Sequence, residues 1–189
     1  TDSGGNTSSF TETILGTVMN KDTNEYFTTI QDAIDDAETL DGHTIYVSDG
    51  TYSETVTVNK ELTVEGQSTE NTIIDVSNGV WIATSNITFR NFTIRNVDDA
   101  GMWIMNTPAR ENVNVSNCEI YNAGRGIHFD MFSQPNKYSI SIYNNTIHDI
   151  SGNGVWVLRV NNVTFDSNTV YDCSKGFYIE GRADDDSSW

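Results

Sequence analysis

The feature that most constrains this chain is an internal repeat. Five tetrapeptides begin with glycine and continue apolar, bulky, apolar: Gly79-Val80-Trp81-Ile82, Gly101-Met102-Trp103-Ile104, Gly126-Ile127-His128-Phe129, Gly154-Val155-Trp156-Val157 and Gly176-Phe177-Tyr178-Ile179. Their glycines are 22, 25, 28 and 22 residues apart. A single repeat of this length cannot bury its apolar side, whereas stacked repeats bury a continuous core. The spacing therefore predicts a solenoid.

Two more short strands recur within each repeat. Middle strands alternate apolar and polar residues at Ile87-Thr88-Phe89, Val113-Asn114-Val115, Ile140-Ser141-Ile142 and Val163-Thr164-Phe165. Each is followed, five residues after its last apolar residue, by Ile94, Ile120, Ile147 or Val170 in a third strand. Three short strands per repeat predict an all-β, right-handed parallel β-helix with coils over residues 43–181.

An amphipathic segment precedes the coils. Apolar residues at positions 27, 30, 33, 34, 37 and 40 trace one helical face, and Thr28 with Gln31 has the spacing of a capping box. We expect a helix over residues 27–40 that plugs the first coil, behind an extended segment over residues 1–26. An acidic tail over residues 182–189 follows the last coil.

This entry region resembles a known family. Residues 26–34, Ile45-Tyr46-Val47, Gly50-Thr51-Tyr52-Ser53-Glu54 and Leu62-Thr63-Val64-Glu65-Gly66 are similar to the entry region of pectin methylesterases. The same opening is shared across the pectate-lyase-like β-helix superfamily, which includes repeat proteins of archaeal and bacterial surfaces. The resemblance implies this fold. The motifs that carry pectin methylesterase or pectate lyase catalysis are not found in the chain, so we name no catalytic residue and favour a protein that is not an enzyme.

Alternation within the glycine-led strands predicts an outward row of rings. If Val80 and its equivalents point inward, then Trp81, Trp103, His128, Trp156 and Tyr178 point outward, with Asp130 beside His128. We call this row the aromatic stripe. It could be covered by another segment of the chain, bind a protein neighbour, or stack on sugars. His128 with Asp130 could also form an acid/base pair. A second row, Arg95, Tyr121, His148 and Tyr171, is interpreted as solvated surface.

Short polar residues recur at two corners of the coils. One row is Asn91, Asn117 and Asn144, continued one place later by Asn145 and Asn168, and the other is Asn96, Asn122, Asp149 and Asp172. Stacked amides can bond to one another and to turn backbone, so these rows are predicted to be structural ladders. No metal site or cofactor is predicted, apart from weak calcium binding at Asp184-Asp185-Asp186.

The two cysteines are predicted to stay unpaired. Cys118 and Cys173 fall two coils apart, or roughly 9–10 Å along the axis, whereas a disulfide needs Cα atoms within about 7 Å. Cys118 is expected in the core.

Charge and sequons indicate location and partners. The chain has 27 acidic and 10 basic residues, a net charge of −17, which disfavours nucleic acid and anionic lipid. No apolar run is long enough for membrane insertion. Six sequons stand at Asn6, Asn86, Asn91, Asn114, Asn144 and Asn162 and permit glycosylation. We therefore predict an extracellular, non-catalytic structural module of a surface layer, sheath or filament that self-associates or contacts neighbouring subunits. The alternative is a carbohydrate-binding or carbohydrate-active β-helix that uses the aromatic stripe.

Overall fold

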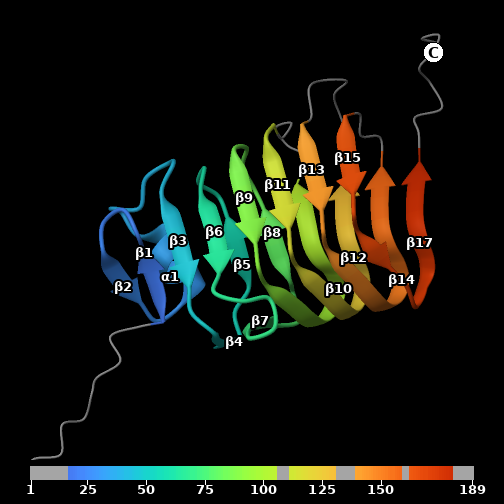
Figure 1. Ribbon diagram of the computed structural model, residues 1–189, viewed down its shortest axis with the longest axis horizontal. Coiled ribbons are helices and arrows are strands. Elements are labelled where there is room, and N and C mark those ends of the chain that lie inside the picture. The colour runs from blue at the N-terminus through green and yellow to red at the C-terminus, as the bar shows by residue number, and fades with distance from the viewer. Residues whose placement is uncertain (1–16, 106–110, 131–138, 159–161, 181–189) are drawn as a thin grey trace, which may run out of the picture.

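The chain forms a parallel β-helix, as the repeat predicts. The computed structural model describes residues 17–105, 111–130, 139–158 and 162–180. Coils stack along one long axis, from the blue N-terminal end to β17 in red (Figure 1). The acidic tail, Asn6 and most of the 1–26 segment lie outside the described residues.

Two sheets make up the wall of the β-helix in the described ranges. The first has the order β15 (Val163–Asp166), β13 (Ile140–Tyr143), β11 (Val113–Ser116), β9 (Ile87–Arg90), β6 (Thr63–Gly66), β3 (Thr44–Val47), β1 (Val18–Asn20) and β2 (Glu25–Phe27). The main path of the second is β16 (Thr169–Val170), β14 (Thr146–Leu158), β12 (Glu119–Asp130), β10 (Thr93–Met105), β7 (Thr72–Asp75) and β4 (Gly50–Tyr52). Off this path, β17 (Cys173–Glu180) pairs with β14, and β8 (Val80–Ile82) pairs with β10 and β5 (Val56–Val58).

The predicted register is confirmed in all three strand positions. Met102 aligns with Val80 and Ile127, Val115 aligns with Phe89 and Ile142, and Ile120 aligns with Ile94 and Ile147. The column of strands that contains Val80 and its equivalents also begins one coil earlier than predicted. β5 pairs with β8 through Val56 and Val80, although no glycine precedes Val56.

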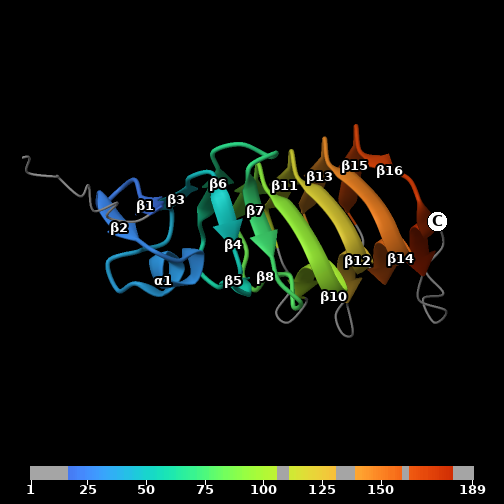
Figure 2. The same ribbon diagram turned by 90° about the horizontal axis from the view of Figure 1, so that it is seen from below.

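The prediction of three separate strands per coil is wrong for the later coils. The third strand and the following glycine-led strand run together as the long strands β10, β12 and β14, which lie side by side in Figure 2. The pairing of β10 with β12 shifts register between Val97 and Ala100, so the chain bends there without leaving the ladder.

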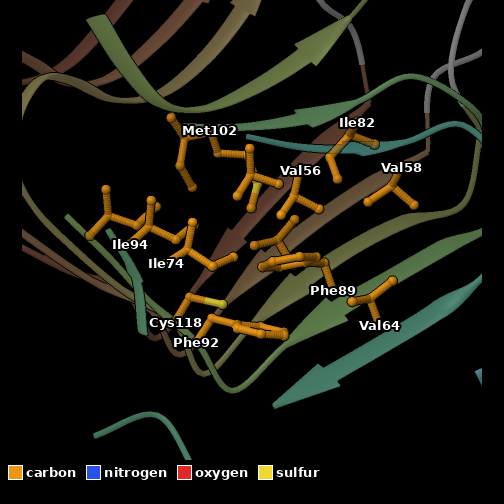
Figure 3. Close-up of a cluster of buried hydrophobic side chains, with 14 of the residues drawn as sticks. Val56, Val58, Val64, Ile74, Ile82, Phe89, Phe92, Ile94, Met102 and Cys118 are labelled. Carbon is orange, nitrogen blue, oxygen red and sulfur yellow. The ribbon is translucent and has the colours of Figure 1, made fainter. Parts of the chain in front are cut away.

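The inward-facing side chains form one continuous apolar core. Phe89 and Phe92 are fully buried, and their rings lie 4.5 Å apart at the centre of the column (Figure 3). Ile74, Ile94 and Met102 pack on the facing side of the same interior. Burial of this column is the main stabilising contribution to a fold in which each coil contacts only its neighbours.

A cap closes the N-terminal end, but its helix is much shorter than predicted. α1 spans Ile30–Asp35 instead of residues 27–40. The N-cap is Thr29, whose hydroxyl accepts from the N–H of Asp32, so the predicted Thr28 capping box is off by one residue. The carboxylate of Glu54 accepts from the N–H groups of Ile30 and Gln31, 2.8 and 2.9 Å away, and satisfies two more free donors of the first turn.

Two antiparallel strands complete the cap. β1 pairs antiparallel with both β2 and β3, although parallel pairing prevails between the coils. Phe27, expected on the helix, instead ends β2. Val18, Ile30 and Ile34 are fully buried, so the apolar end of the first coil is covered.

Candidate functional site: two columns of stacked side chains

The aromatic stripe is one continuous column on the outer surface of the second sheet. Its five rings lie in β8, β10, β12, β14 and β17, and the backbone register aligns each with the next: Trp81, Trp103, His128, Trp156 and Tyr178. On β8, the residues on either side of Trp81, Val80 and Ile82, point inward and are fully buried. Alternation along each strand therefore places the rings outside the apolar core.

Each ring of the stripe contacts the equivalent ring in the next coil. Trp81 and Trp103 are stacked with centroids 5.7 Å apart and an interplanar angle of 16°. His128 lies 4.2 Å from Trp103 and 4.5 Å from Trp156, and is stacked on Trp156 at 12°. Tyr178 contacts Trp156 edge-on at 6.0 Å. The Trp103 and His128 rings are tilted at 57° to each other, so the column mixes stacked, tilted and edge-on contacts.

Two cations rest on ring faces of this column. The Arg125 guanidinium lies 4.4 Å from the centroid of Trp156, and the Lys175 ammonium lies 4.4 Å from that of Tyr178. These are cation–π distances, so these faces are also occupied. All four aromatic residues of the stripe are half-buried.

His128 is more buried than an outward position suggests. It is 3% exposed, and neither ring nitrogen has a hydrogen-bond partner. Burial, reinforced by the charge of Arg125, lowers the pKa of His128 from 6.5 to about 4. The imidazole is therefore neutral at neutral pH and acts as a stacked ring. Asp130 ends β12 opposite Met105, but its side chain lies outside the described residues, so the predicted acid/base pair stays a prediction.

The second row lies at the surface, with Tyr171 46% exposed, but its side chains also stack on one another from coil to coil. Tyr121 and His148 are stacked at 5.1 Å and 12°, and His148 and Tyr171 at 4.9 Å and 5°. Arg95 extends the column by donating from Nη1 to the Tyr121 hydroxyl at 3.3 Å, while its Nε bonds Asp75 at 2.9 Å. Each side chain contacts its equivalent in the next coil, which sequence alone could not show because it depends on rotamers.

His148 is the most polar member of this column. Its Nδ1 lies 2.8 Å from Asp149 Oδ2, and its Nε2 lies 3.2 Å from Glu119 Oε1. Burial alone would lower the pKa of His148, but the hydrogen bonds and charges of Asp149 and Glu119 outweigh it and raise the pKa above its ordinary value.

The predicted corner rows lie at sharp bends with left-handed backbone. Asn91, Asn117 and Asn144 have φ between 51° and 63°, a conformation that asparagine tolerates better than most residues. Asn144 donates to Asn117 at 2.6 Å, and Asn117 donates to Asn91 at 3.2 Å. In the second row, Asn122 donates to Asn96, which in turn donates to Asp75. Asp149 and Asp172 continue that row with positive φ.

Asn145 and Asn168 belong to a separate, inner chain of amides. Asn145 is 1% exposed, and its side chain accepts from the N–H of Cys118 at 2.9 Å while donating to Val115 O at 3.1 Å. Asn168 accepts from the backbone and side-chain amides of Asn145, both at 3.0 Å. The sequence predicts these residues in the same row as Asn144, because adjacent positions in a turn do not reveal which side chain points inward.

A shallow groove of about 620 Å³ runs beside the first corner row. Its lining is polar and comprises Gln67, Ser68, Thr69, Glu70, Asn91, Asn117, Cys118, Glu119, Asn144 and Thr146. Within the described ranges, no three His, Cys, Asp or Glu side chains converge as a metal site would require. Asp184-Asp185-Asp186, the predicted calcium ligands, lie outside these ranges.

The cysteines and sequons have distinct environments. Cys118 is buried and Cys173 is half-buried, and both thiols are free. Burial raises the pKa of Cys118 to about 12. The sequon residues Asn86, Asn144 and Asn162 are exposed, whereas Asn91 and Asn114 are half-buried. None of the helices described here is long and apolar enough to cross a membrane.

The fold and these columns define a repetitive β-helix whose surface side chains join coil to coil. Residues 62–185 match the family of the right handed beta helix region, and the chain belongs to that family. A cell surface glycoprotein of Methanothermus fervidus is 42% identical over 74 residues, which cover 34% of this chain. The matched stretch is only 12% of that relative. No solved structure matches the chain.

Proposed function

We propose that the chain is a non-catalytic structural module of a cell-surface protein. The membership in the right-handed β-helix family and the likeness to part of a protein named as a cell surface glycoprotein support this role. The single observation that carries this proposal is that surface side chains contact their equivalents in the next coil. In the aromatic stripe, in the second row and at both corners, they bind the next coil. A surface organised in this way stiffens a rod.

The stacking also weighs against the carbohydrate alternative. A sugar ring binds an aromatic side chain by lying on an open ring face. In the stripe, Trp103 is stacked on Trp81 and Trp156 is stacked on His128. The Arg125 guanidinium also lies over the Trp156 ring. At least one face of each of these two rings is therefore already in contact with a neighbouring side chain.

The test combines a binding measurement with a stability measurement. We expect tryptophan fluorescence to stay unchanged during titration with acidic and neutral oligosaccharides. We expect Trp103→Ala to lower the free energy of unfolding by about 1–3 kcal/mol, because stacking and burial are lost together. Tyr143→Ala is the matched control, since Tyr143 is 41% exposed and belongs to neither column. Saturable fluorescence quenching by a sugar that Trp103→Ala abolishes would contradict the structural role.

Surface location and glycosylation form part of this proposal. Asn86, Asn144 and Asn162 are exposed at corners, so we expect glycans there before the half-buried Asn91 and Asn114. Peptide mass spectrometry of protein purified from its native host tests this order. Glycans confined to Asn91 or Asn114 would overturn it.

A further inference from the structure

We propose that the aromatic stripe transfers single electrons from coil to coil, so that an oxidation begun at one of its indoles ends on the phenol of Tyr178. Indole and phenol are the aromatic side chains that lose one electron most readily. The ring centroids of Trp81 and Trp103 are 5.7 Å apart, and those of Trp156 and Tyr178 are 6.0 Å apart. Rings this close exchange electrons by tunnelling. This activity is additional to the structural role and does not depend on it.

His128 connects the two pairs of rings. Trp103 and Trp156 stand two strands apart in the ladder, which separates them by about 9–10 Å. The imidazole of His128 lies between them, with its centroid 4.2 Å from that of Trp103 and 4.5 Å from that of Trp156. Imidazole is harder to oxidise than indole, so the electron passes through this ring without resting on it. A packed ring is a better tunnelling medium than water, and the column is therefore electronically continuous.

The indole proton of Trp156 favours onward transfer. Loss of one electron turns an indole into a radical cation, which gives up its N–H proton where a base is hydrogen-bonded to it. Trp156 Nε1 is buried and has no hydrogen-bond partner among the described residues. The nitrogens of His128 are also without such a partner, so the imidazole is not placed to take this proton. Oxidised Trp156 therefore keeps its positive charge and readily takes an electron from a neighbouring ring.

Tyr178 can supply that electron because its proton has a base to go to. The Tyr178 hydroxyl donates to Glu180 Oε2 at 3.3 Å. When Tyr178 gives one electron to the Trp156 radical cation, the phenol O–H bond breaks and the proton forms a new O–H bond on the Glu180 carboxylate. The products are neutral Trp156, a neutral tyrosyl radical and a protonated Glu180. One positive and one negative charge disappear together, so the step is balanced.

Two cations favour the same direction of transfer. The Arg125 guanidinium lies 4.4 Å from the centroid of Trp156, and its charge makes a radical cation on that ring less favourable. The Lys175 ammonium lies 4.4 Å from the centroid of Tyr178. The tyrosyl radical is uncharged once its proton has left, so Lys175 does not repel it. The oxidation is therefore driven off Trp156 and held on Tyr178.

The second row provides a matched control, because it stacks in the same way without these features. Tyr121 and Tyr171 both stack on His148, a ring that is harder to oxidise than an indole. The Tyr121 hydroxyl accepts a hydrogen bond from Arg95, a cation that cannot take the phenol proton. Tyr171 is 46% exposed, so Tyr171→Phe removes one surface phenol and keeps the ring, as Tyr178→Phe does.

Pulse radiolysis of the full 189-residue chain tests the proposal, with the azide radical as the one-electron oxidant. This radical takes an electron from an indole and becomes azide ion, and indole and phenoxyl radicals absorb visible light in separate bands. Trp189 lies outside the described residues, so every protein in the test carries Trp189→Phe. We expect the indole signal to convert completely into the phenoxyl signal, at a rate independent of protein concentration. Tyr178→Phe should abolish this conversion, whereas Tyr171→Phe should leave its rate and extent unchanged.

Two further variants test the path and the proton step. Trp156→Phe replaces the indole beside Tyr178 by a ring that is not readily oxidised, so conversion should become slower. Glu180→Gln keeps the shape of the side chain but offers a much weaker base, so conversion should again become slower. Circular dichroism should show the same fold for all variants, because each keeps a ring or a side chain of the same size.

The opposite results overturn the proposal. Conversion that persists in Tyr178→Phe shows another acceptor, and a rate that grows with protein concentration shows transfer between molecules. A phenoxyl yield no larger than the share of radicals formed on Trp156 shows that nothing arrives from Trp81 and Trp103. An unchanged rate in Trp156→Phe contradicts the path, and an unchanged rate in Glu180→Gln contradicts the proton step.

Discussion

His148 in β14 reaches back one coil to Glu119 in β12, with 3.2 Å between Nε2 and Oε1. Its other nitrogen lies 2.8 Å from Asp149 Oδ2. A carboxylate can only accept, so both nitrogens donate only when the ring is an imidazolium. The geometry and the raised pKa of His148 agree on this charged form.

His148 should make stability depend on pH in one direction. Its pKa is higher in the folded chain, so its contribution is fully present below the ordinary value of about 6.5 and is lost as pH rises through the folded pKa. His148→Gln should cost about 1 kcal/mol at pH 5.5 and less at pH 9. Urea denaturation across this range measures the difference. A cost that is equal at both ends would show that the ion pairs contribute nothing.

His128 should make stability depend on pH in the opposite direction. Its folded pKa of about 4 lies below 6.5, so between these values the unfolded chain binds a proton that the folded chain does not. Stability therefore falls as pH decreases through this window. His128→Phe keeps a ring between Trp103 and Trp156 and removes the titrating group, so the fall contributed by this position should disappear. Thermal unfolding at pH 4.5 and 7.5 compares the two chains. An unchanged acid sensitivity in the variant would assign the effect to other groups.

Gly154 and Gly176 occupy equivalent positions in adjacent coils, but substitution by alanine should destabilise the fold only at Gly154. Gly154→Ala places a methyl group 2.5 Å from Val170 Cγ1 and 2.8 Å from Gly176 O, so it should destabilise the fold by about 1–3 kcal/mol. Gly176→Ala meets only Val170, at 3.9 Å, and should change monomer stability by less than about 0.5 kcal/mol. Chemical denaturation at low protein concentration gives both values. Equal losses would contradict the looser packing around Gly176.

Substitutions at the adjacent residues Asn144 and Asn145 should also have unequal costs in stability. Asn145→Ala leaves the buried N–H of Cys118 and the carbonyl of Val115 without their partner, which should cost about 2–4 kcal/mol. Asn144 lies at an exposed corner with φ 54°, and Asn144→Gly keeps that conformation while losing one bond to Asn117. We expect it to cost about 1 kcal/mol. Equilibrium unfolding of both variants tests this, and a larger loss at Asn144 would contradict the inner amide chain.

Much of the fold follows from the sequence because its period is strict. The five-residue step from Phe89 to Ile94 recurs in each later coil, and the backbone register aligns Ile94 with Ile120 as predicted. The prediction of the cap is less accurate, because the apolar residues from position 27 onward fit a longer helix than Ile30–Asp35. Phe27 pairs in β2 instead, since tertiary contacts outweigh helical periodicity at its ends.

The site was harder to predict for a physical reason. Alternation predicts that Trp103 and Tyr121 face outward, but not whether each ring lies flat on the surface or stacks on the next coil. That choice depends on χ angles and on neighbours about one strand spacing away. The sequence therefore predicts neither the stacking of Tyr121, His148 and Tyr171 nor the burial of His128.

The cap gives the first coil a neighbour on both of its sides. Coils that contact only their neighbours can open one at a time, but a coil held from both sides opens less readily. Amide protons of β3, which pairs with β1 and β6, should then exchange with solvent as slowly as those of β6, which pairs with β3 and β9. The cap works as an anchor, because α1 and β1 hold the first coil on the side away from its neighbour.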